Sequence, residues 1–253
     1  MKKYKKVLAA LMLMTAVIMT ACNPKDDTND NDDNGGDDVV DCGGIGTYGG
    51  HEYVDLCLPS GTLWATCNVG ANTPEGYGDY YAWGEVQTKS RYHWNNYRHC
   101  KGNWDQLTKY CFEPEYGYEG FTDSLKFLTY EDDYVMINWA NGWRMPTNEQ
   151  WRELLQNTEC VWTTQNGVNG RLFTADNGHS LFLPAAGVLF SYGPVTDEDV
   201  QGYYWSDELG MNENGISSIS AGSFVFNSSV AIPRRDERYL GYSIRPVHNK
   251  LSE

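Results

Sequence analysis

The stretch 138–157, NWANGWRMPTNEQWRELLQN, constrains the fold of this chain more than any other part. Thr147 fits the N-cap of a helix, because Gln150 three residues later completes a capping box that satisfies free backbone amides. Apolar residues then recur at the spacing of one helix face: Trp151, Leu154 and Leu155. The sequence therefore predicts an amphipathic helix that packs this face against the rest of the domain.

Shorter runs around this helix fit β-strands. Their apolar and aromatic residues are bounded by turn residues, and we place strands at 51–58, 63–69, 78–85, 161–165, 171–175, 180–187, 202–207, 216–227 and 240–247. A second, short helix is predicted near 130–139, with Thr129 as its cap. Residues 86–128 lack periodic signals, so we expect a long loop that is functional or pinned. These elements predict an α+β domain with short antiparallel strands and two central helices.

The N-terminus has the pattern of a bacterial lipoprotein signal. Residues 1–21 hold four early lysines and then the apolar run Val7–Met19, which is shorter than the ~20 residues of a membrane span. Small residues precede Cys22, as in a lipobox, where the cysteine becomes acylated. We therefore predict lipidation of Cys22 and an outer-membrane lipid anchor. An ordinary signal peptide with a chance cysteine is the alternative.

Residues 22–41 are of low complexity and acidic, with eight aspartates and one lysine. Such a segment buries too little apolar area to offset the entropy of ordering, so we expect a disordered tether before a domain at 42–253. The Lys-Asp-Asp behind Cys22 resembles export signals of surface-displayed Bacteroidetes lipoproteins. Residues 30–41 match the ligand spacing of a calcium loop, but no flanking helices are predicted, so no metal site is expected. The net charge of −15 makes nucleic acid an improbable partner.

Six cysteines remain besides Cys22: Cys42, Cys57, Cys67, Cys100, Cys111 and Cys160. An even number in an exported chain indicates disulfides, and six cysteines allow fifteen connectivities. We predict the pairs 100–111, 67–160 and 42–57. Zinc is disfavoured, because no C-x2-C pair occurs and the five histidines are scattered.

A series of motifs resembles one known family. VDLCLPSGTLWATCNVGA, GDYYAWGE, LTKYC, NWANGWRMPTNEQW, WTTQNGVNG, FLPAAG, YYWS and SIRPV occur over residues 50–247 in the order seen in the Fibrobacter succinogenes major paralogous domain. The resemblance implies a C-type-lectin-like fold related to formylglycine-generating enzymes. In such a fold the chain ends come together and the last strand pairs near the first. The family has no established activity that carries over to these residues.

Two departures and one further match accompany this resemblance. Cys57 stands where relatives usually have glycine, which implies an added disulfide with Cys42. EDDYVMINWANG replaces the commoner DDAA-x-x-NWG form and adds bulk to the first predicted helix. Asp123-Ser124-Leu125 resembles sites of O-glycosylation in exported Bacteroidetes proteins, so Ser124 is a predicted modification site.

No motif for catalysis is present. The sequence has no H-E-x-x-H, G-x-S-x-G or Walker A motif. An oxidase of the formylglycine-generating type needs a late cysteine pair, and no cysteine follows Cys160. His93 and His99 lack a carboxylate or histidine cluster and fit loop histidines. We therefore expect no enzyme activity, cofactor or metal.

Aromatic residues carry the strongest signal for binding. The chain has nine tryptophans and eighteen tyrosines. Five tryptophans fall in family motifs and are assigned to the core: Trp83, Trp143, Trp151, Trp162 and Trp205. In the long loop, Trp94, Tyr97 and Trp104 stand beside Asn95, Asn96, Arg98 and Asp105, and flat rings next to polar groups suit sugars or protein partners. Tyr203 and Tyr204 are further candidates. The alternative is that these rings pack the loop against the core.

The resulting hypothesis is a surface-exposed, lipid-anchored lipoprotein with one disulfide-stapled domain. Its function would be non-catalytic binding of a glycan or protein ligand through the aromatic loop 92–105 and the adjoining strand 203–207. A structural or adhesion subunit that packs against a partner protein is the alternative. The local basic cluster Arg234, Arg235 and Arg238 is expected to pair with neighbouring carboxylates.

Overall fold

The computed structural model describes residues 43–191, 193–212 and 215–250, which belong to one compact unit. The predicted signal peptide, the lipidation site Cys22, the acidic tether with its calcium-like motif, and Cys42 lie outside the described residues. No helix in the described ranges is long and apolar enough to cross a membrane.

The first sheet joins both ends of the described chain. Its strands are β1 (Gly44–Tyr48), β2 (His51–Asp55), β3 (Thr62–Ala65) and β10 (Val247–Asn249), in the order β1-β2-β3-β10. Val247 is opposite Trp64 in an antiparallel register, so the last strand closes the sheet formed by the first three. The expected pairing of the last strand with the N-terminal strands is confirmed.

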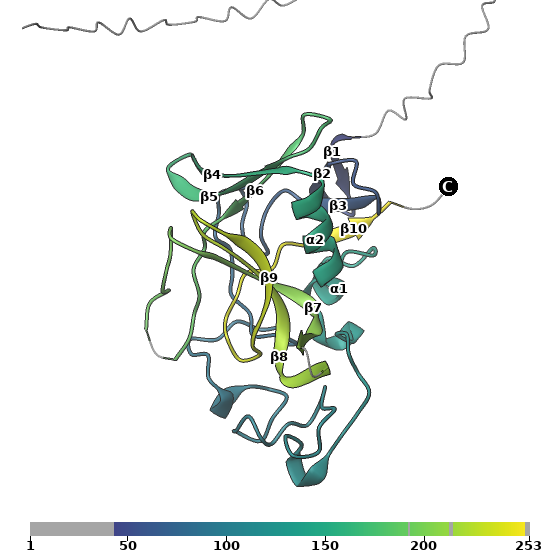
Figure 1. Ribbon diagram of the computed structural model, residues 1–253, viewed down its shortest axis with the longest axis vertical. Coiled ribbons are helices and arrows are strands. Elements are labelled where there is room, and N and C mark those ends of the chain that lie inside the picture. The colour runs from purple at the N-terminus through teal and green to yellow at the C-terminus, as the bar shows by residue number, and fades with distance from the viewer. Residues whose placement is uncertain (1–42, 192, 213–214, 251–253) are drawn as a thin grey trace, which may run out of the picture. The chain divides into compact units, whose positions relative to one another are not determined.

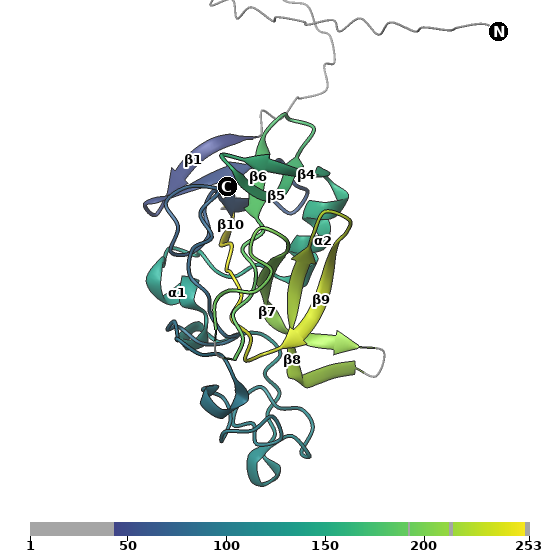
Figure 2. The same ribbon diagram turned by 90° about the vertical axis from the view of Figure 1, so that its left-hand side faces the viewer.

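Two more antiparallel sheets follow helix α2 (Asn148–Gln156) in the chain. One has the order β4-β5-β6 and the other β7-β8-β9. Their strands are β4 (Glu159–Gln165), β5 (Val168–Thr174), β6 (Ser180–Pro184), β7 (Gly202–Asn212), β8 (Gly215–Phe226) and β9 (Ala231–Glu237). Figure 1 shows the first two sheets at one end of the domain and the third beside α2. Figure 2 shows that residues 86–128 form the opposite end.

Helix α2 (Asn148–Gln156) confirms the predicted amphipathic helix. Thr147 Oγ1 accepts a hydrogen bond from Gln150 N, and the Gln150 side chain accepts one from Thr147 N. Trp151 is fully buried, stacked on Phe224 at a ring-centroid distance of 4.7 Å. Leu154 is buried as well. Local capping and the spacing of apolar residues therefore determine this element and dock it on β8.

The predicted α+β class with two central helices is wrong, because the domain is mostly β, with three antiparallel sheets. The C-type-lectin-like fold implied by the family resemblance stays a prediction. Besides α2, the α-helical residues of the described chain are the five of α1 (Tyr134–Asn138). Asp133 caps α1 from a buried position by accepting bonds from Val135 N and Met136 N. The chain then reverses through left-handed residues at 140–142, which ends the helix after little more than one turn. The predicted cap, Thr129, precedes a short 3-10 turn instead, Tyr130–Asp132.

Most strands lie where the sequence predicts them, with four exceptions. The predicted strand 240–247 overlaps β10 at Val247 alone, and residues 241–243 form isolated bridges instead. Residues 78–85 contain one isolated bridge, Tyr81 to Tyr242, and no strand. Strand β1 was not predicted, because its glycines resemble a linker. Strand β9 was also missed, since AIPRRDE holds a proline and four charges in seven residues. These residues suit an edge strand, which pairs on one side only.

Two of the three predicted disulfides are wrong. Cys67, Cys100, Cys111 and Cys160 are free thiols, so the pairs 100–111 and 67–160 do not form. Short sequence separation does not bring two Cβ atoms to the separation of ~3.5–4.5 Å that a disulfide needs. Cys57 is disulfide-bonded, and its predicted partner, Cys42, lies outside the described residues.

Candidate functional site

Residues 86–128, here called the lobe, have little regular structure. Their helical turns are η1 (Trp94–Asn96) and η2 (Tyr118–Gly120), and the prediction of a long loop is confirmed. Leu107, which is fully buried, organises the lobe: its N–H donates to Tyr116 O over 2.7 Å and its carbonyl accepts from Tyr118 N over 2.8 Å. The lobe thus gains backbone hydrogen bonds without a sheet.

Asp123 fixes the return of the lobe to the domain. Its carboxylate accepts hydrogen bonds from Tyr110 N at 2.7 Å, Cys111 N at 3.0 Å and Leu125 N at 3.2 Å. Its own N–H donates to Cys111 O. One side chain therefore satisfies three backbone amides that have no ladder partner, which is the usual requirement for irregular backbone near a core.

Arg238 joins the lobe to the sheets. The side chain is fully buried, and its guanidinium donates to Tyr97 Oη, Tyr110 O, Ser218 O and Lys109 O over 2.6–3.0 Å. Three rings lie within 5.1–5.6 Å of it: Trp83, Tyr97 and Tyr110. The expectation that Arg238 pairs with a carboxylate is wrong. It is a cation held by carbonyls and ring faces, whereas Arg234 does pair with Asp236, at 3.6 Å.

A second polar network lies beside Arg238. Lys109 Nζ lies 2.7 Å from Asp132 Oδ2 and 2.8 Å from Glu131 Oε1, and Tyr110 Oη also donates to Asp132 Oδ2. His99 Nε2 lies 2.8 Å from Gly84 O. Burial and the nearby Arg238 lower the pKa of His99 to about 4, so its ring is neutral at pH 7.

Three of the predicted binding rings are inside the protein. Trp94 is 6% exposed, Tyr97 is 3% exposed and Tyr204 is fully buried. Tyr97 Oη donates to Trp83 O, and Tyr204 Oη donates to Pro184 O. These rings cannot offer a face to a ligand, so their assignment as ligand-binding residues is corrected. The alternative that the loop rings pack against the core holds for Trp94 and Tyr97.

The other two predicted rings are accessible to different degrees. Tyr203 is half-buried and donates a hydrogen bond to Asp197 Oδ2. Trp104 is 43% exposed and lies 5.7 Å from the ring of Tyr116. It belongs to a set of lobe residues here called the aromatic tip, which consists of the exposed Trp104, Tyr118 and Phe121 and the partly buried Tyr116.

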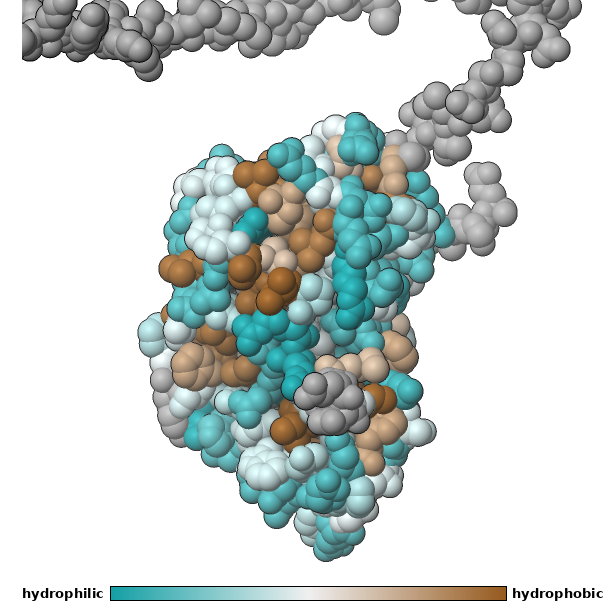
Figure 3. Space-filling model, viewed as in Figure 1, coloured by the Kyte–Doolittle hydropathy of each residue, from teal (hydrophilic) through white to brown (hydrophobic). Residues whose placement is uncertain are grey.

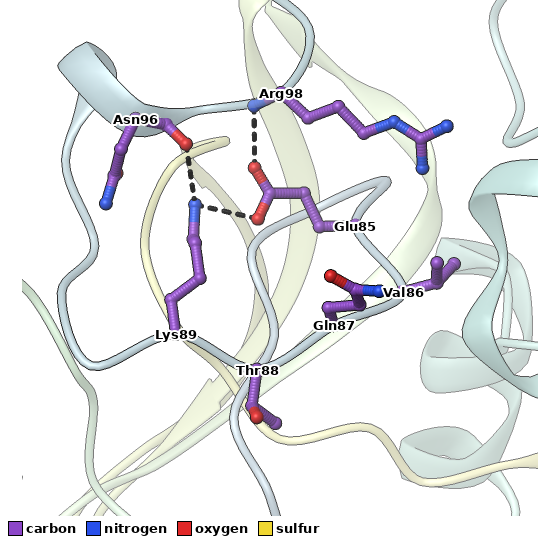
Figure 4. A pocket seen from close by; sticks show the side chains of 7 residues that line it. All are labelled: Glu85, Val86, Gln87, Thr88, Lys89, Asn96 and Arg98. Atoms are coloured by element: carbon purple, nitrogen blue, oxygen red, sulfur yellow. Dashed lines mark hydrogen bonds and ion pairs between the residues drawn. The ribbon is translucent and has the colours of Figure 1, made fainter.

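The polar residues between the buried rings line a pocket. A cavity of about 470 Å³ opens at the base of the lobe, lined by Glu85, Val86, Gln87, Thr88, Lys89, Asn96 and Arg98. Figure 4 shows these residues on the turn 85–89 and the segment 96–98, where Glu85 and Lys89 meet while the side chains of Thr88 and Arg98 point in different directions. The volume lies in the range of ~300–1,000 Å³ that small-ligand sites occupy. We call it the base pocket.

Glu85 makes the base pocket rigid. It is buried, its Oε1 accepts a hydrogen bond from Arg98 N at 2.7 Å, and its Oε2 lies 2.7 Å from Lys89 Nζ. Lys89 Nζ also donates to Asn96 O. Gly84, before Glu85, has a φ of 74°, and a Cβ there would approach His99 Nε2 to 3.0 Å. The turn is therefore fixed on both sides of the pocket, and glycine is required at its start.

The remaining polar groups of the base pocket face solvent. Gln87 and Thr88 are exposed, and the Arg98 side chain is 52% exposed. Arg98 Nη1 lies 3.7 Å from Asp132 Oδ1, an ion pair too long for a hydrogen bond. An amide, a hydroxyl and a guanidinium are thus available to a ligand in one cavity. Figure 3 shows that this end of the molecule is mostly hydrophilic on the visible face.

The metal-ligating side chains of the described residues are dispersed. These residues contain no group of three or more His, Cys, Asp or Glu side chains placed to hold a metal ion. His93 caps η1 by accepting from Asn95 N, and His99 is enclosed among Gly84, Asp132 and Tyr110. In the base pocket the carboxylate of Glu85 is already bonded at both oxygens.

The sequence prediction and the structure point to the same segment but to different side chains. Asn96 and Arg98 were noted only as neighbours of the rings, and the turn 85–89 was not considered. A usable signal was present, because the small, polar and charged residues of GEVQTKS follow directly after an apolar motif. Such a turn beside a rigid strand or core commonly carries binding residues.

Comparison of the chain with protein-family models, with curated proteins and with solved structures found no match. The motif resemblance to the paralogous-domain family stays a prediction, and the functional argument rests on the site itself.

Proposed function

We propose that this chain is a surface-anchored lipoprotein whose folded domain is a non-catalytic glycan-binding module, with the base pocket as the sugar site. The anchor rests on the lipobox-like Cys22 and the acidic segment behind it. The observation that carries the binding function is the lining of the cavity of about 470 Å³, where Gln87, Thr88 and Arg98 offer free hydrogen-bonding groups.

Neutral hydrogen-bonding groups in a small open cavity match the hydroxyls of a sugar better than the surface of a protein. A stable protein–protein contact buries roughly 1,200–2,000 Å² and centres on aromatic or arginine anchors. The base pocket is small and presents no exposed ring among its lining residues in the described chain. One or two sugar units fit such a site, held by the amide of Gln87 and the hydroxyl of Thr88.

The carboxylates of the pocket support the proposal of binding without hydrolysis. Glycoside hydrolysis commonly uses two carboxyl groups, ~5–9.5 Å apart, one of which accepts or donates a proton. Among the described residues that line the pocket, Glu85 supplies one carboxylate, and Arg98 N and Lys89 Nζ occupy its oxygens. The pocket therefore supports recognition and offers no acid–base pair.

The aromatic tip favours a second candidate, an adhesion subunit that docks on a partner protein. Trp104, Tyr118 and Phe121 are each at least 37% exposed, and Lys101 Nζ lies 5.8 Å from the Tyr118 ring centroid. Exposed aromatic residues of this kind are enriched in protein interfaces. The two candidates place the ligand at different ends of the lobe, so they can be separated by mutation.

A glycan array followed by calorimetry on the strongest sugar tests the proposal. We expect Gln87→Ala and Arg98→Ala to weaken binding by ~10-fold or more, the equivalent of ~1.4 kcal/mol. Trp104→Ala is the matched control, since Trp104 is exposed on the same lobe, and it should bind as the wild type does. Loss of binding in Trp104→Ala with full binding in Arg98→Ala would show that the ligand binds at the aromatic tip and not in the base pocket. An array without any bound glycan would refute the proposed function.

A further inference from the structure

The base pocket has an unequal distribution of charge. Glu85 and Lys89 neutralise each other at 2.7 Å. The third charged residue of the lining is Arg98, which has no opposite charge inside the cavity. On a chain with a net charge of −15, this leaves one positive group at the mouth of a pocket. A ligand with an anionic substituent gains Coulomb attraction there that a neutral ligand does not.

The guanidinium of Arg98 is available for such a ligand. Its contact with Asp132 is 3.7 Å long, and no hydrogen bond of the guanidinium to another described residue accompanies it. Asp132 is bonded by Lys109 Nζ and Tyr110 Oη at 2.7 Å through Oδ2, whereas its buried Oδ1 makes no hydrogen bond and has Arg98 Nη1 3.7 Å away. Arg98 therefore keeps hydrogen-bond donors directed to solvent while its backbone N–H stays fixed on Glu85.

The hydrogen-bonding groups of the pocket also favour an acceptor-rich ligand. Glu85, the carboxylate among the lining residues described, has both oxygens occupied. Gln87, Thr88 and Arg98 can all donate. Guanidinium groups bind carboxylates and sulfates through two parallel N–H···O bonds, which are stronger than neutral hydrogen bonds.

We propose that the base pocket selects sugars with an anionic substituent, a carboxylate or a sulfate, and that Arg98 is the residue that binds this group. The inference rests on the proposed glycan-binding function and names its ligand class. Gln87 and Thr88 hold the hydroxyls of the same sugar unit, and the pair Glu85–Lys89 keeps the turn in place without competing for the anion.

Three probes test the selection: oligogalacturonate, a sulfated galactan oligomer and a neutral galactan oligomer. Titration calorimetry on the purified protein should show at least one anionic probe binding ~10-fold or more tighter than the neutral probe. The preferred anionic probe identifies whether the carboxylate or the sulfate fits. Raising the salt concentration should weaken the anionic probe and leave the neutral one nearly unchanged.

Substitutions at Arg98 locate the effect. Arg98→Gln should reduce the affinity for the anionic probe to that for the neutral one, and Arg98→Lys should retain only part of the preference, because an ammonium does not form the paired bonds. Lys101→Gln, at an exposed lysine of the same lobe, is the matched control and should retain the preference. The melting temperature of each variant checks that it is folded, and the half-exposed Arg98 side chain makes this the expected result.

The outcomes separate this inference from the proposed function. Equal binding of neutral and anionic probes, with both weakened by Gln87→Ala, would overturn the selection while the glycan site stands. A preference that survives Arg98→Gln would overturn the role of Arg98. Absence of binding by all three probes, in an array without any other bound glycan, would refute the proposed function and the selection together.

Discussion

The β core and the lobe are both ordered, but different interactions hold them. In the core, strand ladders satisfy the backbone, and large rings such as Trp64, Trp151 and Trp205 fill the interior. In the lobe, a few buried polar side chains, chiefly Arg238 and Asp123, satisfy the backbone instead. The buried rings of the lobe, such as Trp94 and Tyr97, are used for internal packing, and polar residues line the base pocket.

The difference has a functional consequence. Distant side chains supply the hydrogen-bond partners of the lobe's backbone, so the lobe is held in place without strands. Its outward-facing residues are therefore not needed to hold the fold. In the sheets, by contrast, alternate residues of each strand face the core and are used for packing. The lobe is therefore the part of the domain that combines a fixed backbone with polar surface side chains that the fold does not use.

The largest effect is expected from the core. Trp151→Ala removes a fully buried ring that contacts Trp64, Tyr204 and Phe224, and should reduce the free energy of unfolding by ~3–5 kcal/mol. Urea denaturation measures this change. A loss under about 1 kcal/mol would show that the packing around α2 does not stabilise the core as described.

Arg238→Met should be the most damaging change for the lobe. It leaves several buried acceptors without a donor, including Tyr110 O and Ser218 O, and should cost about 3 kcal/mol. Hydrogen exchange of amides in 92–123 should accelerate more than that of β5. The control is Arg234→Met on β9, the strand that ends just before Arg238, and its half-exposed ion pair should contribute less than ~1 kcal/mol. Unchanged protection of the lobe in Arg238→Met would contradict the comparison.

Acidification should loosen the lobe through His99. Burial lowers the pKa of His99 to about 4, below its value of ~6.5 in an unfolded chain. The folded state thus binds fewer protons between these values, so stability falls as the pH drops from about 6.5 to 4. Asp207 has the opposite effect on stability. Burial raises its pKa to about 8, so the folded state binds more protons than the unfolded state and this contribution to stability rises as the pH falls.

The contribution of His99 is isolated by comparison with His99→Gln, whose amide can still donate to Gly84 O. Urea denaturation at several pH values should show that the stability difference between wild type and variant shifts against the wild type as the pH falls from 6.5 to 4. A difference that is independent of pH would show that His99 does not titrate in this way.

The smallest effect is expected at the aromatic tip. Trp104→Ala removes an exposed ring that contacts the ring of Tyr116. Because the ring is exposed, the free energy of unfolding should change by less than ~1 kcal/mol. Urea denaturation beside Trp94→Ala sharpens the comparison, because Trp94 is buried in the same lobe and should cost ~3–5 kcal/mol. Equal losses of unfolding free energy in the two variants would show that the two rings contribute equally to stability, which contradicts the comparison.

Local signals in the sequence were sufficient for α2 and for most strands. The capping box at Thr147 and the apolar spacing from Trp151 act within one helix, so they can be recognised without tertiary information. Four of the five tryptophans assigned to the core are fully buried, while Trp162 is only partly buried. The length of the irregular segment 86–128 was also predictable, because it lacks periodicity.

The site depends on contacts that no local pattern encodes. Arg238 bonds Tyr97 across 141 residues of sequence, and this contact decides that the ring points inward. The sequence suggested a disulfide between Cys100 and Cys111 as the fastening of the loop, whereas Asp123 and Arg238 fulfil that role. The helix predicted near 130–139 is shortened to α1 (Tyr134–Asn138) for a similar reason, since Asp132 and Asp133 are committed to buried networks.

Chemical-shift mapping of a bound glycan on the labelled protein tests the central claim most directly. The strongest array hit, or oligogalacturonate, is titrated while backbone amide signals are followed. The account predicts shifts concentrated at the base pocket, at Gln87, Thr88 and Arg98, with little change at Trp104 and Tyr118. Shifts centred on Trp104 and Tyr118, with the amides of 85–98 unmoved, would contradict it.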